Sequence, residues 1–369
     1  MRGGSMFIDV RRCLLFPLVL LFASAAPAQQ SSPAAQAGAG KIVLDVVVTS
    51  KSGALVTGLQ QQDFTILDNK VPRTITGFQA VEGKQAPVEV ILLIDTVNAP
   101  YEAVSFARDQ IDKFLRAEGG DLSHPTALAF LTDTGLQFQP DFSTDGNALS
   151  ASLDRYTVSL RALRRSAGFY GGVERFQISL DGLHNLVERE APRPGRKIVL
   201  CISPGWPLLS GPEVQLDEKE RQQLFGDIVD FSTEFLRNRV TLYSITPWGV
   251  IEPIGRQTYW ESFLKGISKT SQVDAGDLAV QVLATQSGGV AFAAGNDLTA
   301  LLQDALSDTR AYYEIAFDAP ASDGPIEYHR LQVEVATHGE TARTRQGYYS
   351  GPNIKWGSLP KPLDTGNRE

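Results

Sequence analysis

Asp95 is the polar residue best placed for chemistry, because it ends a mostly apolar run over residues 88–94 and is followed by Thr96 and Asn98. A buried strand that ends in a carboxylate and leads through a short loop into a helix is how an open α/β sheet forms a site at its crevice. Carboxylate, hydroxyl and amide oxygens are ligands for hard cations such as Mg²⁺. The pattern marks Asp95 as a candidate metal ligand, with Thr96 and Asn98 as candidate partners.

Two later strand ends carry further candidates. Ser203 directly follows an apolar run over residues 197–202, and its hydroxyl could complete a ligand shell at Asp95. Trp206 and, after the run at residues 240–245, Trp248 lie in proline-containing loops on the same predicted edge of the sheet. Aromatic side chains often anchor protein partners, so we predict that both tryptophans line an interaction surface. The alternative is that they pack the loops in which they lie.

The sequence contains no recognisable catalytic motif, and we predict no enzymatic activity. Ser203 is followed by Pro204 and Gly205, which differs from G-x-S-x-G, and a proline lacks the backbone N–H that an oxyanion hole would use there. No glycine-rich phosphate-binding motif follows any expected strand. A hydrolase with an unrecognised site is the remaining enzymatic alternative.

The four histidines lack the spacing of a zinc site, since neither H-E-x-x-H nor C-x-x-C occurs. His184 lies at the edge of an apolar helix stripe, where we expect a half-buried, hydrogen-bonded side chain. His124 precedes a strand and is interpreted as a loop residue. His329 and His338 bracket the strand around Leu331, and both are interpreted as polar residues at strand ends.

Strands alternating with helices over residues 86–310 predict the element that positions these candidates. The expected fold is an α/β domain with a doubly wound, mostly parallel, six-stranded sheet covered on both faces. The six strands are expected at residues 88–95, 127–131, 136–138, 197–202, 240–245 and 290–293. Apolar stripes of helical period predict the intervening helices, for example Val104, Ala107, Ile111, Phe114 and Leu115 after Pro100.

Two β segments flank this domain. In residues 41–85, Ile42 and Leu44 begin an alternation of apolar and polar residues, and residues 311–350 return to the same pattern around Leu331 and Val333. We expect the N-terminal segment to form a small sandwich or a sheet extension, and the C-terminal segment to form a second β extension. About forty residues make a thin free-standing unit, so the N-terminal segment is expected to pack on its neighbour.

The ends of the chain have their own compositions. Residues 1–28 combine three arginines, an apolar run of about a dozen residues and an A-x-A site, which predicts a cleaved signal peptide and an exported protein, periplasmic or extracellular. A membrane anchor is the alternative, but a span takes roughly 20 apolar residues. Residues 29–40 are a predicted flexible linker and residues 351–369 a predicted disordered tail. Cleavage would leave Cys201 as the remaining cysteine, an expected buried thiol without a disulfide partner.

The charge of the chain bears on its partners. Removing residues 1–28 takes away three arginines and one aspartate, which changes the formal net charge from −8 to −10. An acidic chain disfavours nucleic acid as a partner. We expect a protein or cell-surface ligand instead, and no membrane span after cleavage.

A succession of short motifs resembles the bacterial, acidobacterial-type von Willebrand factor A-related domain family. Its order along residues 41–349 carries the resemblance more than any single motif does. The matching segments are Val56-Thr57-Gly58-Leu59, Asp63-Phe64, Ile91-Leu92-Leu93-Ile94-Asp95-Thr96, Leu242-Tyr243-Ser244-Ile245, Ser287-Gly288-Gly289, Asn296-Asp297-Leu298, Tyr312-Tyr313 and Arg345-Gln346-Gly347-Tyr348. The resemblance implies a von Willebrand factor A-like fold with β extensions, usually in exported proteins.

Such domains often carry a metal-ion-dependent adhesion site, which the resemblance implies for the loop after the first strand. Asp95 fills the first position, but Val97 and Ala99 stand where the site has serines. Val173 stands in the later loop where a threonine is expected, and Ser203 where an aspartate is expected. The site is therefore degenerate, and Mg²⁺ is not an expected cofactor.

A rebuilt metal site is the alternative, with Thr96 and Asn98 turned toward the metal and Ser203, Thr132 or Asp133 completing the shell. The interpretation we favour is that the Asp95 carboxylate caps the first turn of the following helix. The sequence thus predicts an exported, non-enzymatic, metal-independent interaction module. A metal-dependent adhesion module and a hydrolase are the alternatives.

Overall fold

The computed structural model describes residues 40–83, 87–139, 141–157, 168–207, 216–246, 258–293, 295–320 and 325–351. The chain divides into two units, Met1–Ser32 and Pro33–Glu369, and every described residue belongs to the second. Apart from Gly40 and Gly351 at their borders, the predicted signal peptide, linker and disordered tail lie outside the described residues. Within the described ranges, no helix is both long enough and apolar enough to cross a membrane.

A mostly parallel sheet forms the centre of the described unit. Its strand order is β11-β10-β9-β5-β6-β7, with β8 paired to β6. The strands are β5 (Val88–Asp95), β6 (Asp121–Thr132), β7 (Gly135–Phe138), β8 (Ser143–Asp145), β9 (Arg196–Ile202), β10 (Val240–Ile245) and β11 (Ala291–Phe292). All neighbours are parallel except β7 and β8, which run antiparallel to β6. The predicted mixed α/β class is confirmed, but the predicted count of six strands is wrong, because the short β8 has no apolar pattern to reveal it.

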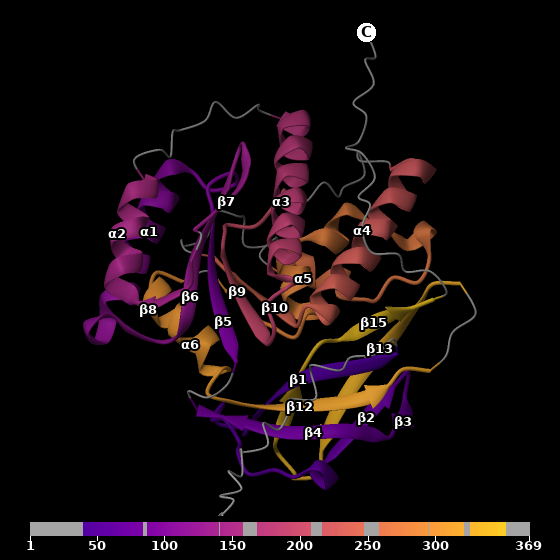
Figure 1. Cartoon of the computed structure of the whole chain (residues 1–369). Helices are drawn as coiled ribbons and strands as arrows, with labels where there is room; N and C mark the ends of the chain where they lie inside the picture. Colours follow the sequence, from indigo (N-terminus) through magenta and orange to yellow (C-terminus); the bar gives the residue numbers. More distant parts are fainter. Residues whose placement is uncertain are drawn as a thin grey trace, which may run out of the picture. The chain divides into compact units, whose positions relative to one another are not determined.

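Helices cover both faces of this sheet, as Figure 1 shows. One face packs on α1 (Tyr101–Arg116), α2 (Gly146–Thr157) and α6 (Leu298–Ser307), and the other on α3 (Gly168–Glu190), α4 (Glu218–Arg237) and α5 (Val280–Gln286). The pleat of β5 explains the division, since Leu92 and Ile94 belong to the first core and Ile91 and Leu93 to the second. Short 3₁₀ turns complete the connections at Gln61–Asp63, Ala117–Gly120, Tyr259–Phe263, Thr270–Gln272 and Ala275–Leu278.

The two flanking β segments combine into one sandwich rather than two separate extensions. One sheet has the order β14-β1-β12-β4 and the other β15-β13-β2-β3. The strands are β1 (Lys41–Thr49), β2 (Phe64–Asp68), β3 (Val71–Arg73), β4 (Ile75–Glu82), β12 (Ala311–Asp318), β13 (Glu327–Val335), β14 (Thr341–Arg343) and β15 (Gly347–Ser350). Their inward-facing residues form a single apolar core. The segments predicted as separate N- and C-terminal β extensions thus share both sheets, because each sheet takes strands from both ends of the described chain.

A polar junction links the sandwich to the central sheet. Arg239, in the turn before β10, forms ion pairs with Asp45 of β1 and with Glu314 of β12, the latter at 2.7 Å. The three side chains are at most 10% exposed. Because burial of an unpaired charge is costly, this cluster specifies how the last turn before β10 meets the sandwich.

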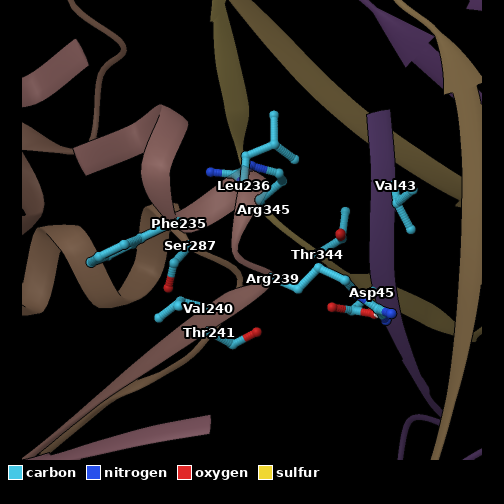
Figure 2. Close-up of a pocket in the computed structure, with 10 residues that line it drawn as sticks. All are labelled: Val43, Asp45, Phe235, Leu236, Arg239, Val240, Thr241, Ser287, Thr344 and Arg345. Carbon is cyan, nitrogen blue, oxygen red and sulfur yellow. Dashed lines mark hydrogen bonds and ion pairs between the residues drawn. The ribbon is translucent and has the colours of Figure 1, made fainter. Parts of the chain in front are cut away.

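Figure 2 shows a small pocket at this junction. Arg239 and Thr344 contribute polar atoms to it, and the Arg239 Nε and Nη1 and the Thr344 Oγ1 atoms have no hydrogen-bond partner in the part of the chain that the structure describes. The space open to a water molecule is about 20 Å³, whereas sites for organic ligands occupy roughly 300 Å³ or more. The pocket therefore belongs to the junction and is not a site for an organic molecule.

Candidate functional site

Asp95 lies at the carboxyl end of β5, where β5 meets β9 in the middle of the sheet. The chain continues from β5 to β6 on one side, and from β9 to β10 on the other. This point between β5 and β9 is the topological switch point, at which open α/β sheets form their binding crevices. The predicted placement of Asp95 at the end of a central parallel strand is therefore confirmed, and this strand end lies at the switch point.

Four hydrogen bonds occupy the Asp95 carboxylate. The backbone N–H groups of Val97 and Asn98 each donate to Oδ1 at 2.9 Å. The Asn98 side-chain amide donates to Oδ2 at 2.8 Å, and the Ser203 hydroxyl donates to Oδ2 at 2.7 Å. The last of these bonds spans the switch point from β5 to the loop after β9.

Burial raises the pKa of Asp95, and the hydrogen bonds from Ser203, Asn98 and Val97 oppose that rise. The side chain is 1% exposed. A buried carboxylate without hydrogen-bond partners would strongly destabilise the fold. The donors from Val97, Asn98 and Ser203 offset this cost of burial. The Asp95 carboxylate therefore acts mainly as the hydrogen-bond acceptor that fixes the conformation of its own loop.

The predicted helix cap is wrong in its position. Helix α1 begins at Tyr101, with Pro100 as its N-cap and no side-chain capping bond. Asp95 instead closes the turn formed by Val97 and Asn98, ahead of the helix. The carboxylate does accept hydrogen bonds from backbone N–H groups, as a cap would, but these groups belong to the loop and not to the helix.

Asn98 connects this loop to α3. Its Nδ2 atom donates to the Ser179 Oγ atom at 2.9 Å, and that hydroxyl donates to the Arg175 carbonyl at 2.7 Å. The Asn98 Oδ1 atom is buried and has no hydrogen-bond partner among the described residues. Sequence reasoning missed Ser179, although it lies three residues after Phe176 on the buried stripe of the predicted helix, which was a usable signal.

The other residues of the predicted metal shell point elsewhere. The Thr96 hydroxyl donates to the Leu131 carbonyl of β6 at 2.7 Å, and the Thr132 hydroxyl donates to the Gly135 carbonyl at 2.8 Å. Asp133 is exposed. Thr96 and Thr132 therefore bind backbone on the far side of β5 from Ser203. Of the predicted shell, the structure brings Asn98 and Ser203 to Asp95 but not Thr96, Thr132 or Asp133.

The positions that the resemblance assigns to metal ligands are also accounted for. Val97 is buried in the core beneath α3 and α4, and Ala99 packs with Ala103 and Val104 of α1. Val173 lies in the first part of α3, so the segment expected to be a loop is helical. No group of three histidine, cysteine, aspartate or glutamate side chains in the described ranges is arranged to hold a metal ion.

The two tryptophans were predicted to line an interaction surface. Trp206 is 5% exposed and belongs to the core beneath α3 and α4, so this prediction is wrong and the loop-packing alternative is correct for it. Trp248 lies outside the described residues. Large exposed aromatic residues on the helices linked to the Asp95 loop are Tyr101, at the start of α1, and Tyr170, in the first turns of α3, which are 63% and 81% exposed.

Of the remaining candidates, Cys201 is fully buried, as predicted. His184 is also buried, and it shares a hydrogen bond of 3.0 Å with Glu234 between α3 and α4. His124 lies inside β6 and His329 inside β13, and both are buried, so their assignments to a loop and a strand end are wrong.

Helices α3 and α4 carry a cluster of titratable groups. His184 on α3 faces Glu234 on α4, and its Nε2 atom lies 3.3 Å from Glu188. Burial, with a smaller contribution from neighbouring carboxylates, raises the pKa of Asp227 to about 7 and that of Asp230 to about 6. The hydrogen bond to Glu234 raises the pKa of His184. From these shifts we expect the α3–α4 contact to weaken as the pH rises.

No family model and no curated protein matches the chain. Among solved structures, human COPII-coat protein Sec24c is similar over 80% of this chain, with a TM-score of 0.36 and 10% identity. A mutant of the PilB minor pilin from Streptococcus sanguinis is similar over 61% of this chain, with a TM-score of 0.32 and 12% identity. The chain spans 50% of the Sec24c chain and 61% of the pilin chain. The class defined by the fold is mixed α/β, with a mostly parallel central sheet and flanking antiparallel sheets.

Proposed function

We propose that the protein is an exported interaction module that binds a protein or cell-surface ligand through the carboxyl edge of its central sheet, without catalysis or metal at that edge. The observation that carries the proposal is the Asp95 loop, in which four internal hydrogen bonds hold the switch point rigid. A surface that is ordered before binding loses little conformational entropy on association. The resemblance to von Willebrand factor A-related domains is consistent with this role.

Tyr101 and Tyr170 are the proposed anchors for the partner. Both are exposed, and tyrosine is enriched among the residues that dominate binding energy. Ser179 ties α3 to the Asp95 loop, and Tyr170 precedes it by nine residues, which places Tyr170 about 14 Å further along the helix axis. In Figure 1, α3 extends beyond the carboxyl ends of β5 and β9. The N-terminal part of α3 therefore projects past the carboxyl edge of the sheet.

A capture experiment tests this proposal. The purified chain is immobilised, and a cell-envelope extract and a culture supernatant are compared for proteins and polysaccharides retained by the wild type and by a Tyr101→Ser, Tyr170→Ser double variant. The matched control is Tyr259→Ser, a 42% exposed tyrosine in a 3₁₀ turn that belongs to neither α1 nor α3. We expect a retained component that the double variant loses and the control keeps. Equal retention by all three proteins would refute the proposed surface.

The absence of catalysis at this edge is tested separately. Ser203 donates its hydroxyl hydrogen to Asp95 and accepts from the Gly205 N–H, so its oxygen is engaged within the loop. We expect no turnover of a panel of ester, peptide and glycoside substrates that depends on Ser203. Turnover that the Ser203→Ala substitution abolishes would show that the edge is an active site.

One observation favours metal-dependent adhesion as a second candidate function. The buried Asn98 Oδ1 atom is an acceptor without a donor in the described part of the chain, and it belongs to a side chain that already contacts Asp95. The donor set fits Mg²⁺ poorly, because it contains one carboxylate and both of its oxygens already accept hydrogen bonds. A cation would have to displace the donors from Asn98 and Ser203.

Calorimetry distinguishes the two candidates. The wild type is titrated with Mg²⁺, Mn²⁺ and Ca²⁺, and its thermal unfolding is recorded with and without each ion, alongside Asp95→Ala. We expect neither heat of binding nor a shift of the unfolding temperature. Saturable binding that Asp95→Ala removes would establish the metal-dependent function in place of the metal-independent one.

A further inference from the structure

We propose that Asp68, His329 and Ser350, at one end of the β-sandwich, form a serine–histidine–aspartate relay that makes Ser350 a nucleophile toward small activated esters. The His329 Nδ1 atom lies 2.7 Å from Asp68 Oδ1, and the His329 Nε2 atom lies 2.9 Å from the Ser350 Oγ atom. A nucleophile, a base and a group that orients the base, each within hydrogen-bond distance of the next, are the signature of an activated hydroxyl. This site is separate from the Asp95 loop and does not depend on the function proposed for it.

The pleat of the strands brings the three side chains onto one face. In the antiparallel registers, Asp68 is paired with Leu331, His329 with Tyr348, and Ser350 with Glu327. Paired residues, and residues two apart in a strand, point to the same side of a sheet. Leu331 and Tyr348 belong to the apolar core of the sandwich, so Asp68, His329 and Ser350 continue the same inward face. The core thus ends in a row of polar side chains.

Hydrogen-bond chemistry determines the direction of the relay. Asp68 accepts from the Tyr348 hydroxyl at 3.0 Å and forms an ion pair with Arg73 at 2.9 Å, so its carboxylate is used as an acceptor. The His329 Nδ1 atom must then carry the hydrogen that points to Asp68. When the imidazole carries only this hydrogen, Nε2 is the acceptor for the Ser350 hydroxyl. The arrangement is that of a general base directed at a serine.

Burial differs along the relay in the way that a reactive serine requires. Asp68 is 0% exposed and His329 is 8% exposed, so the orienting group and the base are shielded from water. Ser350 is the last residue of β15 and is partly exposed. The ring of Tyr348 stacks on that of His329 with centroids 4.8 Å apart, which restricts rotation of the imidazole. The base is held in place while the nucleophile remains reachable.

The proposed reaction is acyl transfer to Ser350 and then to water. The Oγ atom attacks the ester carbonyl carbon while its proton moves to His329 Nε2, and the carbon–oxygen bond to the alcohol breaks as that proton passes to the leaving oxygen. A water molecule then attacks the acyl carbon while His329 Nε2 takes its proton, and the bond between that carbon and the Ser350 Oγ atom breaks as the proton passes from His329 back to Oγ. The balance is one ester and one water converted into one acid and one alcohol.

A fluorophosphonate probe tests Ser350 directly on the full chain. Attack by Oγ breaks the phosphorus–fluorine bond, releases fluoride and leaves a stable adduct that peptide mapping by mass spectrometry assigns to one residue. We expect the wild type to be labelled at Ser350, Ser350→Ala to be unlabelled, and His329→Gln to be labelled about 100-fold more slowly. The matched control is Ser262→Ala, an exposed serine whose hydroxyl donates to the Tyr259 carbonyl, and its labelling at Ser350 should equal that of the wild type.

A wild-type chain that forms no adduct at Ser350 would overturn the proposal without any variant. Equal labelling rates in the wild type and in a folded His329→Gln would also overturn it, because the serine would then react without the base. If His329→Gln fails to fold, Asp68→Asn supplies the second comparison, since it conserves shape but removes the negative charge beside the imidazole and replaces one acceptor oxygen with an NH2 donor. Labelling of Asp68→Asn as fast as the wild type would contradict the relay.

Discussion

Replacement of Asp227 by asparagine should stabilise the protein at pH 8 and leave its stability nearly unchanged at pH 4. Asp227 lies on α4 and is 7% exposed, and burial, together with Asp230 and Asp181, raises its pKa to about 7 from 3.8 in the unfolded chain. A difference of this size corresponds to roughly 4 kcal/mol when the group is ionised in both states. Because Asp230 titrates together with Asp227, we expect a gain of about 2–4 kcal/mol in the free energy of unfolding.

The sign of the effect follows from which state binds the proton. Between pH 4 and pH 7 the folded protein keeps Asp227 protonated while the unfolded chain has released the proton, so stability falls as the pH rises. His184 acts in the same direction, because Glu234 raises its folded pKa and the stability it contributes at acidic pH is lost as the pH rises through that value. The wild type should therefore be more stable at pH 5 than at pH 8.

Urea unfolding of the wild type and Asp227→Asn at pH 4, 5, 6, 7 and 8, followed by circular dichroism, measures this difference. The control is Asp109→Asn, an exposed aspartate on α1, which should change stability by at most about 0.5 kcal/mol at every pH. The reasoning would be refuted if Asp227→Asn gained as much at pH 4 as at pH 8. A loss of stability at pH 8 would also refute it, since it would mean that the ionised carboxylate is favourably paired.

Three further predictions concern buried polar and close-packed positions, each measured by urea unfolding at pH 7. Asp95→Ala leaves the hydrogen-bond donors of its loop without an acceptor and should lower the free energy of unfolding by about 3 kcal/mol or more. Ser203→Ala removes only one donor and should lower it by about 1 kcal/mol. Equal losses for the two variants would contradict the central role of Asp95. Arg239→Met removes the ion pairs that Arg239 forms with the buried carboxylates of Asp45 and Glu314 and should cost about 3–5 kcal/mol; unchanged stability would contradict the role of Arg239 at this junction. Gly289→Ala would place a Cβ atom 1.9 Å from the Leu242 carbonyl oxygen, so a loss of about 1–3 kcal/mol or more is expected and unchanged stability would be inconsistent with this packing.

The central sheet could be predicted because its strands are buried on both faces. Residues 88–94 and 197–202 are continuous runs with a helical stripe after each, and such runs allow few alternatives. For the sandwich, the sequence predicts β structure in both flanking segments but not which strands pair. Strand β1 pairs with β12, so that Val46 lies opposite Tyr313, and an alternating pattern in one segment does not say which distant segment completes it. The motif Ser287-Gly288-Gly289 has a structural explanation here, since the Ser287 hydroxyl accepts from the Leu242 N–H and Gly288 has a φ of +95°.

The sequence predicts where the candidate site lies in the sheet but not the hydrogen bonds that its side chains form. A strand-end carboxylate next to a strand-end serine follows from parallel strands that finish at one edge, and Asp95 and Ser203 are indeed 2.7 Å apart. The direction of Thr96 could not be foreseen, because a one-residue change in the path of a loop decides whether a hydroxyl meets the carboxylate or the backbone of β6. The prediction for Trp206 was wrong for the same reason: the path of the loop decides whether an indole that follows a strand points to solvent or into the core.

The error at His329 is different, because the sequence contained the information needed to avoid it. Alternation along β13 places His329 two residues before Leu331 and therefore on the inward face, just as Ser350 follows Tyr348 by two. A polar side chain that continues an apolar alternation must find a partner inside, since burial without one is costly. The pattern thus predicts that a partner exists, and the strand registers, which only the fold supplies, identify it as Asp68 on one side of the imidazole and Ser350 on the other. The inward position of His329 and Ser350 at the end of this sandwich thus follows from the same alternation of side chains that forms its apolar core.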